Sequence, residues 1–334
     1  MNYRTLGSSE LQVAEISLGS WLTYAGGVGL EQTRACTDAA FDAGINFFDT
    51  ANLYGQGAAE AAWGGSSPHD PATSTSWRPR SSSRCPTTPP IRACRPPRST
   101  SRSTPRFQRL RTDHIDLYDA HRFDPDVPIE ETLEALGEVM AAGKARYLGF
   151  SEWTVEQIHA AVEIVGAEFL VSSQPQYSML WQAPEAELFD ACTPLGISHV
   201  VWSPLAQGVL TGKYRPGQQP PADSRAASTA DAESSMRGLV MNDATLQAVE
   251  RLRPVAEQAG LSLSELALAW VLRRPEVASA ITGASRPEQV HANAKASGIT
   301  LSQDTLDAID EALGDAPVTQ PTLAPLARVG VTHR

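Results

Sequence analysis

Short apolar runs that end in polar residues recur along this chain, and helical patterns follow most of them. Residues 45–48 are apolar and β-prone, which predicts a short buried strand. Asp49 follows directly, Tyr54 comes five residues later, and Gly55 supplies a turn. Because α/β folds keep their chemistry at the carboxyl ends of strands, Asp49 and Tyr54 are candidate site residues. In the alternative interpretation, Asp49 caps the next turn and Tyr54 packs on the rim of the sheet.

The same pattern predicts six further strands and six helices. The strands are expected at residues 16–19, 115–120, 147–150, 169–172, 198–202 and 280–282. The helices are expected at residues 31–43, 128–142, 154–165, 261–273, 287–296 and 302–313. Gly44 and Gly143 mark two of the helix ends, since glycine is favoured just past a helix. Residues 4–17 alternate around a Gly7-Ser8-Ser9 turn, which predicts an amino-terminal hairpin.

Repeated strand-then-helix units favour a parallel sheet. A closed eight-stranded barrel would bring all the strand ends to one mouth, whereas a doubly wound sheet is the alternative. A doubly wound fold that binds a dinucleotide is expected to have a Gly-x-Gly-x-x-Gly turn after an early strand, and the sequence has none. We therefore predict a single α/β domain over residues 1–334, a (β/α)8 TIM barrel with an amino-terminal hairpin. Seven predicted strands leave the third position of such a barrel empty.

The pattern stops between residues 64 and 106. This segment is rich in serine, proline and arginine, with eight arginines against one acidic residue, Asp70. Apart from Ile91, the segment contains no Val, Leu, Ile, Met, Phe or Tyr. Such a composition buries too little apolar area to offset the entropy of ordering, so we expect the segment to be disordered. One interpretation is a regulatory insert, and the other is a frameshift.

The genetic code favours the frameshift. Reading residues 74–84 from the third base of each codon permits the sequence Tyr-Val-Leu-Ala-Thr-Lys-Val-Phe-Phe, starting at position 74. That sequence would be a buried strand carrying a lysine, which is what the third barrel position requires. Without it, we expect this chain to lack one barrel strand.

Composition narrows the class of protein. With 334 residues, 42% of them hydrophobic, and no run long enough to cross a bilayer, the chain is expected to be a cytoplasmic protein without a signal peptide. The net charge of −11 argues against general nucleic-acid binding. The four cysteines have neither metal-type spacing nor the pattern of a disulfide scaffold.

Several motifs, in their order and spacing, carry a resemblance to a known family over residues 3–63 and 107–313. They are Gly19-Ser20-Trp21, Phe48-Asp49-Thr50-Ala51 with Tyr54-Gly55, Asp116-Leu117-Tyr118 with His121-Arg122, Gly149-Phe150-Ser151, Gln174, Trp202-Ser203-Pro204-Leu205, Gly212-Lys213-Tyr214, and Gly283-Ala284-Ser285 with Gln289 and Asn293. With these motifs the chain resembles the aldo-keto reductases, in the branch similar to potassium-channel β subunits and their bacterial relatives. The resemblance implies a barrel that moves a hydride between NADPH and a carbonyl carbon.

The resemblance also implies the catalytic residues. Tyr54 would be the general acid, with its pKa lowered from about 10 by Asp49 and a lysine. His121 would orient the carbonyl group or share the proton. No lysine lies between Tyr54 and His121, so the expected cation is missing from this chain.

Cofactor contacts are implied for a larger set of residues. The set comprises Ser20 and Trp21 after the first strand, Ser151 and Gln174 on the nicotinamide amide, Trp202 stacked on its ring, Ser203, Leu205, Lys213 and Arg225 around the pyrophosphate, and Gly283, Ser285, Gln289 and Asn293 at the adenosine and its 2′-phosphate. Taken singly, His121 and Trp202 could equally be core residues and Lys213 a surface residue. No metal site is expected.

Two functions follow from the resemblance. The first is NADPH-dependent reduction of a small aldehyde or ketone, with no nucleic acid, membrane or obligatory partner, and with a homo-oligomer left open. The second is a non-catalytic NADPH-binding or partner-regulating protein, and an inactive product of a frameshifted gene is the third alternative. The retained Tyr54 and His121 favour the first function, while the missing lysine favours the second. Glu152 and Ala292 also depart from the family pattern, and we expect both to weaken cofactor binding.

Overall fold

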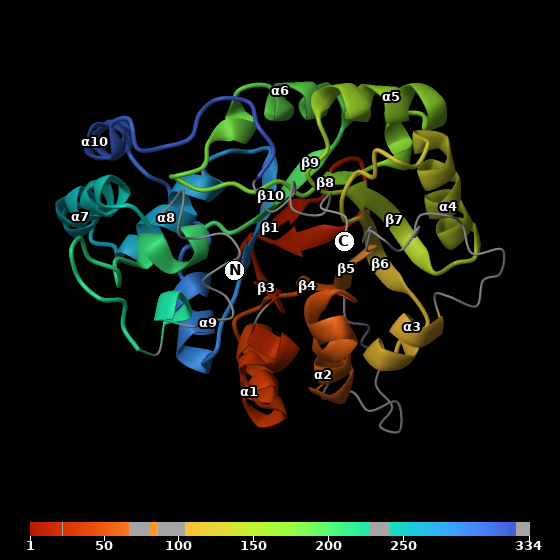
Figure 1. Cartoon of the computed structure of the whole chain (residues 1–334), viewed down its shortest axis with the longest axis horizontal. Helices are drawn as coiled ribbons and strands as arrows, with labels where there is room; N and C mark the ends of the chain where they lie inside the picture. Colours follow the sequence, from red (N-terminus) through yellow and green to blue (C-terminus); the bar gives the residue numbers. More distant parts are fainter. Residues whose placement is uncertain (22, 67–80, 86–103, 223, 228–240, 325–334) are drawn as a thin grey trace.

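In this computed structural model, eight parallel strands close into a barrel that helices surround (Figure 1). The structure describes residues 1–21, 23–66, 81–85, 104–222, 224–227 and 241–324. In barrel order the strands are β3 (Ile16–Gly19), β4 (Phe48–Ala51), β5 (Ser81–Cys85), β6 (Ile115–Ala120), β7 (Ala145–Phe150), β8 (Ser172–Ser173), β9 (Ser198–Trp202) and β10 (Val277–Thr282). Strand β10 pairs in parallel with β3 and closes the barrel. The predicted (β/α)8 fold is confirmed.

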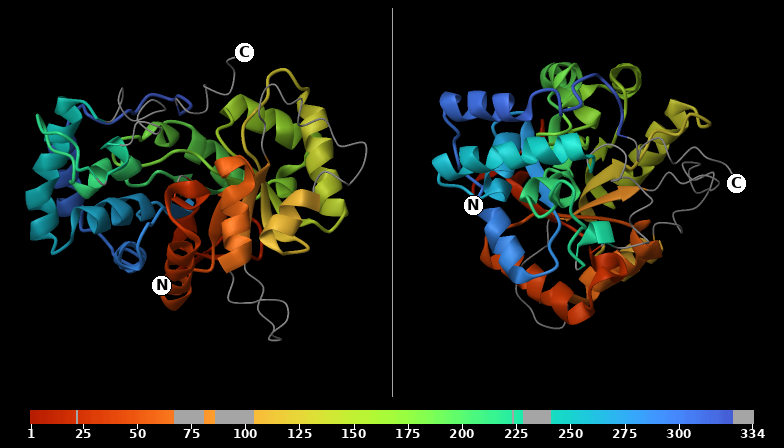
Figure 2. Two further views of the ribbon diagram at one scale, coloured as in Figure 1. Left: turned by 60° about the horizontal axis from the view of Figure 1, so that its bottom comes forward. Right: turned by 60° about the vertical axis from the view of Figure 1, so that its left-hand side comes forward.

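Ten α-helices are described around the strands. They are α1 (Leu30–Asp42), α2 (Ala58–Ser66), α3 (Thr104–Leu110), α4 (Ile129–Ala141), α5 (Val155–Val165), α6 (Leu188–Cys192), α7 (Asp243–Gln258), α8 (Leu263–Leu272), α9 (Pro287–Ala294) and α10 (Gln303–Leu313). Short 3₁₀ or π turns are η1 (Thr23–Gly27), η2 (Tyr54–Gly57), η4 (Ala167–Phe169), η5 (Ala183–Glu185), η6 (Thr193–Leu195), η7 (Ala206–Thr211) and η8 (Arg225–Ala227). Helices α7 and α10 pack on each other at one side of the molecule, as both turned views also show (Figure 2).

Local sequence signals set several helix ends. Helix α5 begins at a capping box in which Thr154 and Gln157 satisfy each other's backbone N–H groups. Ser262 and Glu265 form the same motif at the start of α8. Gly143, just past α4, has a φ of 66°, which favours glycine at that position.

The amino-terminal hairpin is present and covers one end of the barrel. Strands β1 (Tyr3–Thr5) and β2 (Gln12–Ala14) pair antiparallel, and Leu6, Leu11 and Val13 are buried against barrel residues in one apolar cluster. Gly7 has a φ of 53°, and a Cβ there would lie 2.1 Å from the Val171 carbonyl oxygen. Only glycine fits this approach, so the turn fixes how the hairpin meets the barrel.

The prediction that this chain lacks a third barrel strand is wrong. Strand β5 pairs in parallel with β4 on one side and β6 on the other, with Ser82 in register with Asp49 and Leu117. Strand pairing uses backbone N–H and C=O groups, which a serine-rich sequence supplies as well as an apolar one. Of the recoded positions, 74–80 lie outside the described residues, so the frameshift stays a hypothesis.

The predicted disorder of residues 64–106 is also wrong at three places, because residues 64–66, 81–85 and 104–106 belong to α2, β5 and α3. Glu60 of α2 is fully buried, and its carboxylate joins α2 to α3. Arg106 Nε donates to Glu60 Oε1 at 2.7 Å, and Arg109 Nη2 lies 2.6 Å from Glu60 Oε2. This ion-pair cluster secures α3 beside α2, so the chain resumes the barrel pattern before residue 106. The rest of the segment lies outside the described residues.

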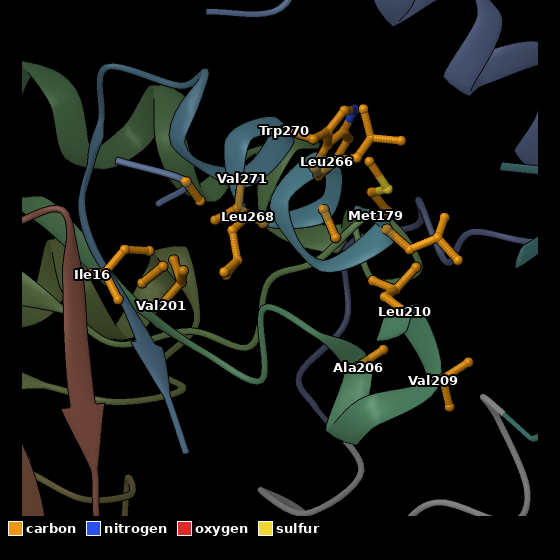
Figure 3. Close-up of a cluster of buried hydrophobic side chains, with 14 of the residues drawn as sticks. Ile16, Met179, Val201, Ala206, Val209, Leu210, Leu266, Leu268, Trp270 and Val271 are labelled. Atoms are coloured by element: carbon orange, nitrogen blue, oxygen red, sulfur yellow. The ribbon is translucent and has the colours of Figure 1, made fainter. Parts of the chain in front are cut away.

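The main apolar core lies between the barrel and α8. Helix α8 presents Leu266, Leu268 and Trp270 to this core, and η7 contributes Val209 and Leu210 (Figure 3). The α8 side chains are buried nearly all round, as expected of a helix enclosed by other elements. This packing holds the loop after β9 against α8, which matters because that loop forms a wall of the site described below. In the part of the chain that the structure describes, no helix is long and apolar enough to span a membrane.

Candidate active site

A cavity of about 940 Å³ opens at the carboxyl ends of the barrel strands. Most of the predicted site residues line it: Trp21, Asp49, Tyr54, His121, Trp202, Ser203, Leu205, Lys213, Arg225, Gly283, Ser285, Gln289 and Asn293. These residues come from distant parts of the sequence and follow β3, β4, β6, β9 and β10. The parallel barrel brings them together because it places all strand ends on one face.

Three predicted cofactor contacts do not line the cavity. Ser20, Ser151 and Gln174 are each fully buried beneath it. Their polar groups contact other site residues instead. They form a buried layer behind the cavity lining, and their assignment as cofactor contacts stays a prediction.

Asp49 is held by this underlying layer. Gln174 Nε2 donates to Asp49 Oδ1 at 3.0 Å, and the Ser20 backbone N–H donates to the Asp49 carbonyl oxygen at 3.0 Å. Asp49 is itself 3% exposed. Gln174 Oε1 has no hydrogen-bond partner among the described residues. The carboxylate is therefore fixed in one orientation at the edge of the cavity.

Tyr54 and His121 face each other across the cavity wall. Their ring centroids are 6.1 Å apart and the rings are nearly perpendicular. Tyr54 begins η2, directly after the chain leaves β4, and its ring also lies 6.5 Å from that of Trp21. Both Tyr54 and His121 are buried to more than nine-tenths. A carbonyl oxygen on the cavity side of this pair would meet a phenol and an imidazole at once.

Arg122 ties the segment that follows β6 to the segment that follows β7. Its Nη1 donates to the His121 carbonyl oxygen at 2.6 Å and to Ser151 Oγ at 2.9 Å. Ser151 Oγ in turn donates to the Gln174 carbonyl oxygen at 2.8 Å. The ends of β6, β7 and β8 are thus connected by side-chain hydrogen bonds, which holds His121 in place.

Trp202 ends β9 and forms a wall of the cavity. Its Nε1 donates to Glu152 Oε1 at 3.0 Å, and Ser203 follows with a φ of 54°. A left-handed φ is uncommon for serine and turns the chain sharply at the cavity edge. Glu152 itself does not line the cavity.

The loop after β9 carries Lys213 back to the cavity. A Cβ on Gly208 would lie 3.0 Å from Lys213 Cε, and Gly208 has a φ of 102°. Glycine at this position therefore leaves room for the lysine side chain. Arg225, from η8, lies with its guanidinium 5.8 Å from the centroid of the Trp21 ring.

The far end of the cavity is formed by the start of α9. Ser285 donates from its backbone N–H and from Oγ to Gln289 Oε1, at 2.8 and 3.2 Å. Arg286 also lines the cavity here and was not among the predicted contacts. The sequence could have indicated Arg286, because this residue lies between the predicted contacts Ser285 and Gln289 and precedes a proline that opens a helix.

The cavity is cationic although the chain is acidic. Its described lining includes Arg122, Lys213, Arg225 and Arg286, and one carboxylate, Asp49. This balance suits an anionic ligand such as a dinucleotide, and the volume accommodates one together with a small substrate. Within the described ranges, no group of three His, Cys, Asp or Glu side chains could hold a metal ion.

Residues 15–313 match the sequence model of the Aldo/keto reductase family, so the chain belongs to this family. It is 34% identical over 345 residues to a "probable voltage-gated potassium channel subunit beta" of Oryza sativa subsp. japonica, covering 95% of this chain and 98% of that protein. It is 32% identical over 331 residues to "L-glyceraldehyde 3-phosphate reductase" of Escherichia coli (strain K12), covering 94% and 93%. A glycerol dehydrogenase structure from Gluconobacter oxydans superposes with a TM-score of 0.78 at 24% identity, covering 96% and 98%, which concerns the fold alone.

Membership of this family identifies the protein as an oxidoreductase of small carbonyl compounds that uses a nicotinamide cofactor. The cationic lining and the aromatic wall at Trp202 fit such a cofactor.

Proposed function

We propose that this protein reduces aldehydes or ketones to alcohols with NADPH in the cavity at the carboxyl ends of the strands. The observation that carries the proposal is the convergence of Asp49, Tyr54 and His121 on one part of a cavity that is otherwise cationic. The name of the Escherichia coli relative, a reductase of an aldehyde phosphate, supports a carbonyl substrate.

The chain's own chemical role is that of an acid. When bound, the cofactor supplies the hydride. The Tyr54 hydroxyl gives its proton to the carbonyl oxygen as the carbonyl carbon is reduced, which completes the alcohol. His121 orients the carbonyl oxygen toward the phenol, and Asp49, held by Gln174, supports the Tyr54 side of the site.

The cofactor is bound by the remaining wall of the cavity. Trp202 packs against the nicotinamide ring. Lys213 and Arg225 neutralise the pyrophosphate, together with the backbone at Ser203 and Leu205. Ser285, Gln289 and Asn293 hold the adenosine end with Gly283, and Arg286 adds a cation for a 2′-phosphate. Cys36 and Cys192 are buried free thiols, which suits the cytoplasm as the compartment.

A second candidate function is NADPH binding without turnover, in a protein that regulates a partner. Two observations favour it: the sequence has no lysine between Tyr54 and His121, and relatives are named as channel subunits. Without a nearby cation the phenol is a poorer match to its proton-transfer task.

Turnover of 4-nitrobenzaldehyde with NADPH, measured beside NADPH binding, distinguishes the two functions. We compare this chain with a variant in which residues 74–82 become Tyr-Val-Leu-Ala-Thr-Lys-Val-Phe-Phe. The matched control has the same replacement with methionine at the lysine position, which keeps the recoded sequence without the charge. We expect rapid turnover from the lysine variant and feeble turnover from the other two. Equal, rapid turnover by all three would show that the lysine is not needed, and tight NADPH binding without turnover by any form would favour the regulatory function.

A further inference from the structure

Glu152 is a buried acid that the proposed chemistry does not use. It lies two residues after β7 and is 6% exposed, and its backbone has a φ of 57°. A left-handed conformation costs a non-glycine residue roughly 1–3 kcal/mol, so the surrounding contacts must hold it there.

Three N–H groups donate to the Glu152 carboxylate. Oε1 accepts from the Gln176 backbone N–H at 2.6 Å and from Trp202 Nε1 at 3.0 Å. Oε2 accepts from the Ala324 backbone N–H at 2.9 Å. These donors come from the chain after β8, from the end of β9 and from near the carboxyl terminus. Hydrogen bonds to a carboxylate are stronger than those between neutral groups, so a single side chain joins three separate segments.

Ala324 belongs to the stretch of residues 318–324, which follows α10. Val318 begins it, donating to the Leu180 carbonyl oxygen at 3.1 Å and accepting from the Gln182 backbone N–H at 2.8 Å. Ala324 is fully buried in the apolar cluster that also contains Trp181 and Trp202. The stretch is therefore held at both ends, and Glu152 supplies the hydrogen bond at its second end.

We propose that Glu152 is a positioning residue that fixes the indole plane of Trp202 and holds residues 318–324 behind it. Trp202 lines the cavity and Glu152 does not, so the carboxylate acts on the ligand through the indole ring. The part of this inference that concerns the cofactor rests on the proposed function. The part that concerns residues 318–324 does not.

The two oxygens of the carboxylate allow the two effects to be separated. In Glu152→Gln, the amide oxygen can keep both donors of Oε1, Gln176 and Trp202. The amide NH₂ then faces the Ala324 N–H, donor against donor, and releases residues 318–324. In Glu152→Ala all three bonds are lost. Glu163→Ala, which removes an exposed carboxylate from α5, is the control.

The experiment combines NADPH titration with amide hydrogen exchange on the full chain. We expect Glu152→Ala to raise the Kd for NADPH roughly ten-fold and to speed exchange across residues 318–324. We expect Glu152→Gln to speed exchange there while changing that Kd by no more than about two-fold. Glu163→Ala should change neither quantity.

Unchanged exchange at residues 318–324 in both Glu152 variants would overturn the link to the carboxyl-terminal stretch. An unchanged NADPH Kd in Glu152→Ala would overturn the link through Trp202. If Glu152→Ala does not fold, Glu152→Gln still tests whether the two effects are separate. A roughly ten-fold rise of its NADPH Kd, together with faster exchange at residues 318–324, would contradict that separation. Absence of NADPH binding by the unaltered chain would count against the proposed function, whereas the exchange result would still decide what Glu152 holds.

Discussion

At the scale of residues, the site depends on side chains that are fixed by others beneath them. Gln174 holds Asp49, Arg122 bonds to the His121 backbone, and Glu152 holds the indole of Trp202. The motifs identified the residues that line the cavity, because those follow strand ends in the sequence. They also named Gln174 and Arg122 but not the hydrogen bonds that these residues make, since such contacts join residues as far apart as Glu152 and Ala324.

Substitution of Arg286 tests how the cavity distinguishes NADPH from NADH. If its guanidinium binds the 2′-phosphate, Arg286→Gln should weaken NADPH binding roughly ten-fold and leave NADH binding nearly unchanged, because NADH lacks that phosphate. Fluorescence titration with both cofactors measures this. Arg111→Gln, an exposed arginine away from the cavity lining, serves as the control. Equal losses for the two cofactors would assign Arg286 to another part of the dinucleotide.

His199 makes stability depend on pH. It is fully buried in β9 with its ring centroid 4.4 Å from that of Phe189, and neither ring nitrogen has a partner among the described residues. Burial, with a smaller contribution from Arg274, lowers the pKa of His199 to about 3. The unfolded chain therefore takes up a proton below about pH 6.5 that the folded chain refuses, so the free energy of unfolding falls as the pH drops from 6.5 toward 3.

The measurement is denaturant unfolding at pH 7 and pH 4. His199→Phe should remove about 3 kcal/mol of the stability lost between these values, because the phenyl ring has no proton to gain. His159→Gln, at an exposed position, should leave the loss as it is in the unaltered chain. The same loss in His199→Phe would mean that other groups control the acid transition.

At the scale of elements, glycines and caps were the most informative signals. Helices α4 and α5 begin and end within one residue of their predicted bounds, since Gly143 and the Thr154 cap are readable locally. Helix α7 was missed because Pro254 lies inside it, and α2 because its alanine- and glycine-rich sequence has little amphipathic character. Strand β5 could not be predicted from side chains, as its backbone pairing with β4 and β6 leaves no pattern in the sequence.

The ion-pair cluster between α2 and α3 should contribute to the stability of the fold. Replacing Glu60 with alanine leaves Arg106, whose side chain is 7% exposed, buried without its carboxylate. Removing one member of a buried ion pair costs about 3–5 kcal/mol, so Glu60→Ala should lower the free energy of unfolding by about that amount. Denaturant unfolding measures the loss, and Glu163→Ala on the exposed face of α5 should change it by no more than about 0.5 kcal/mol. A small effect of Glu60→Ala would show that α3 is not held by these ion pairs.

At the scale of the whole molecule, charge is distributed unevenly. The chain carries a net charge of −11, yet the described lining of its cavity has four basic side chains and one acidic one. An acidic exterior repels other anions, while the cationic cavity concentrates a dinucleotide at the barrel mouth. The barrel and the family were predictable from the sequence because motifs recur at the end of each strand. The course of the carboxyl-terminal stretch was not, since it depends on packing against Trp181 and Trp202.

The central claim is that this cavity reduces a carbonyl compound with Tyr54 as the acid, and isotope transfer tests it most directly. NADPH deuterated at both hydrogens of nicotinamide C4 is incubated with 4-nitrobenzaldehyde, and the alcohol is analysed by mass spectrometry. With the variant that carries the recoded strand at residues 74–82, we predict deuterium in 4-nitrobenzyl alcohol. Adding Tyr54→Phe should slow its formation by about 10²-fold or more, while Tyr147→Phe, beside the amino-terminal hairpin and outside the cavity lining, should not. Unlabelled alcohol, or labelled alcohol formed equally fast without the Tyr54 hydroxyl, would contradict the account.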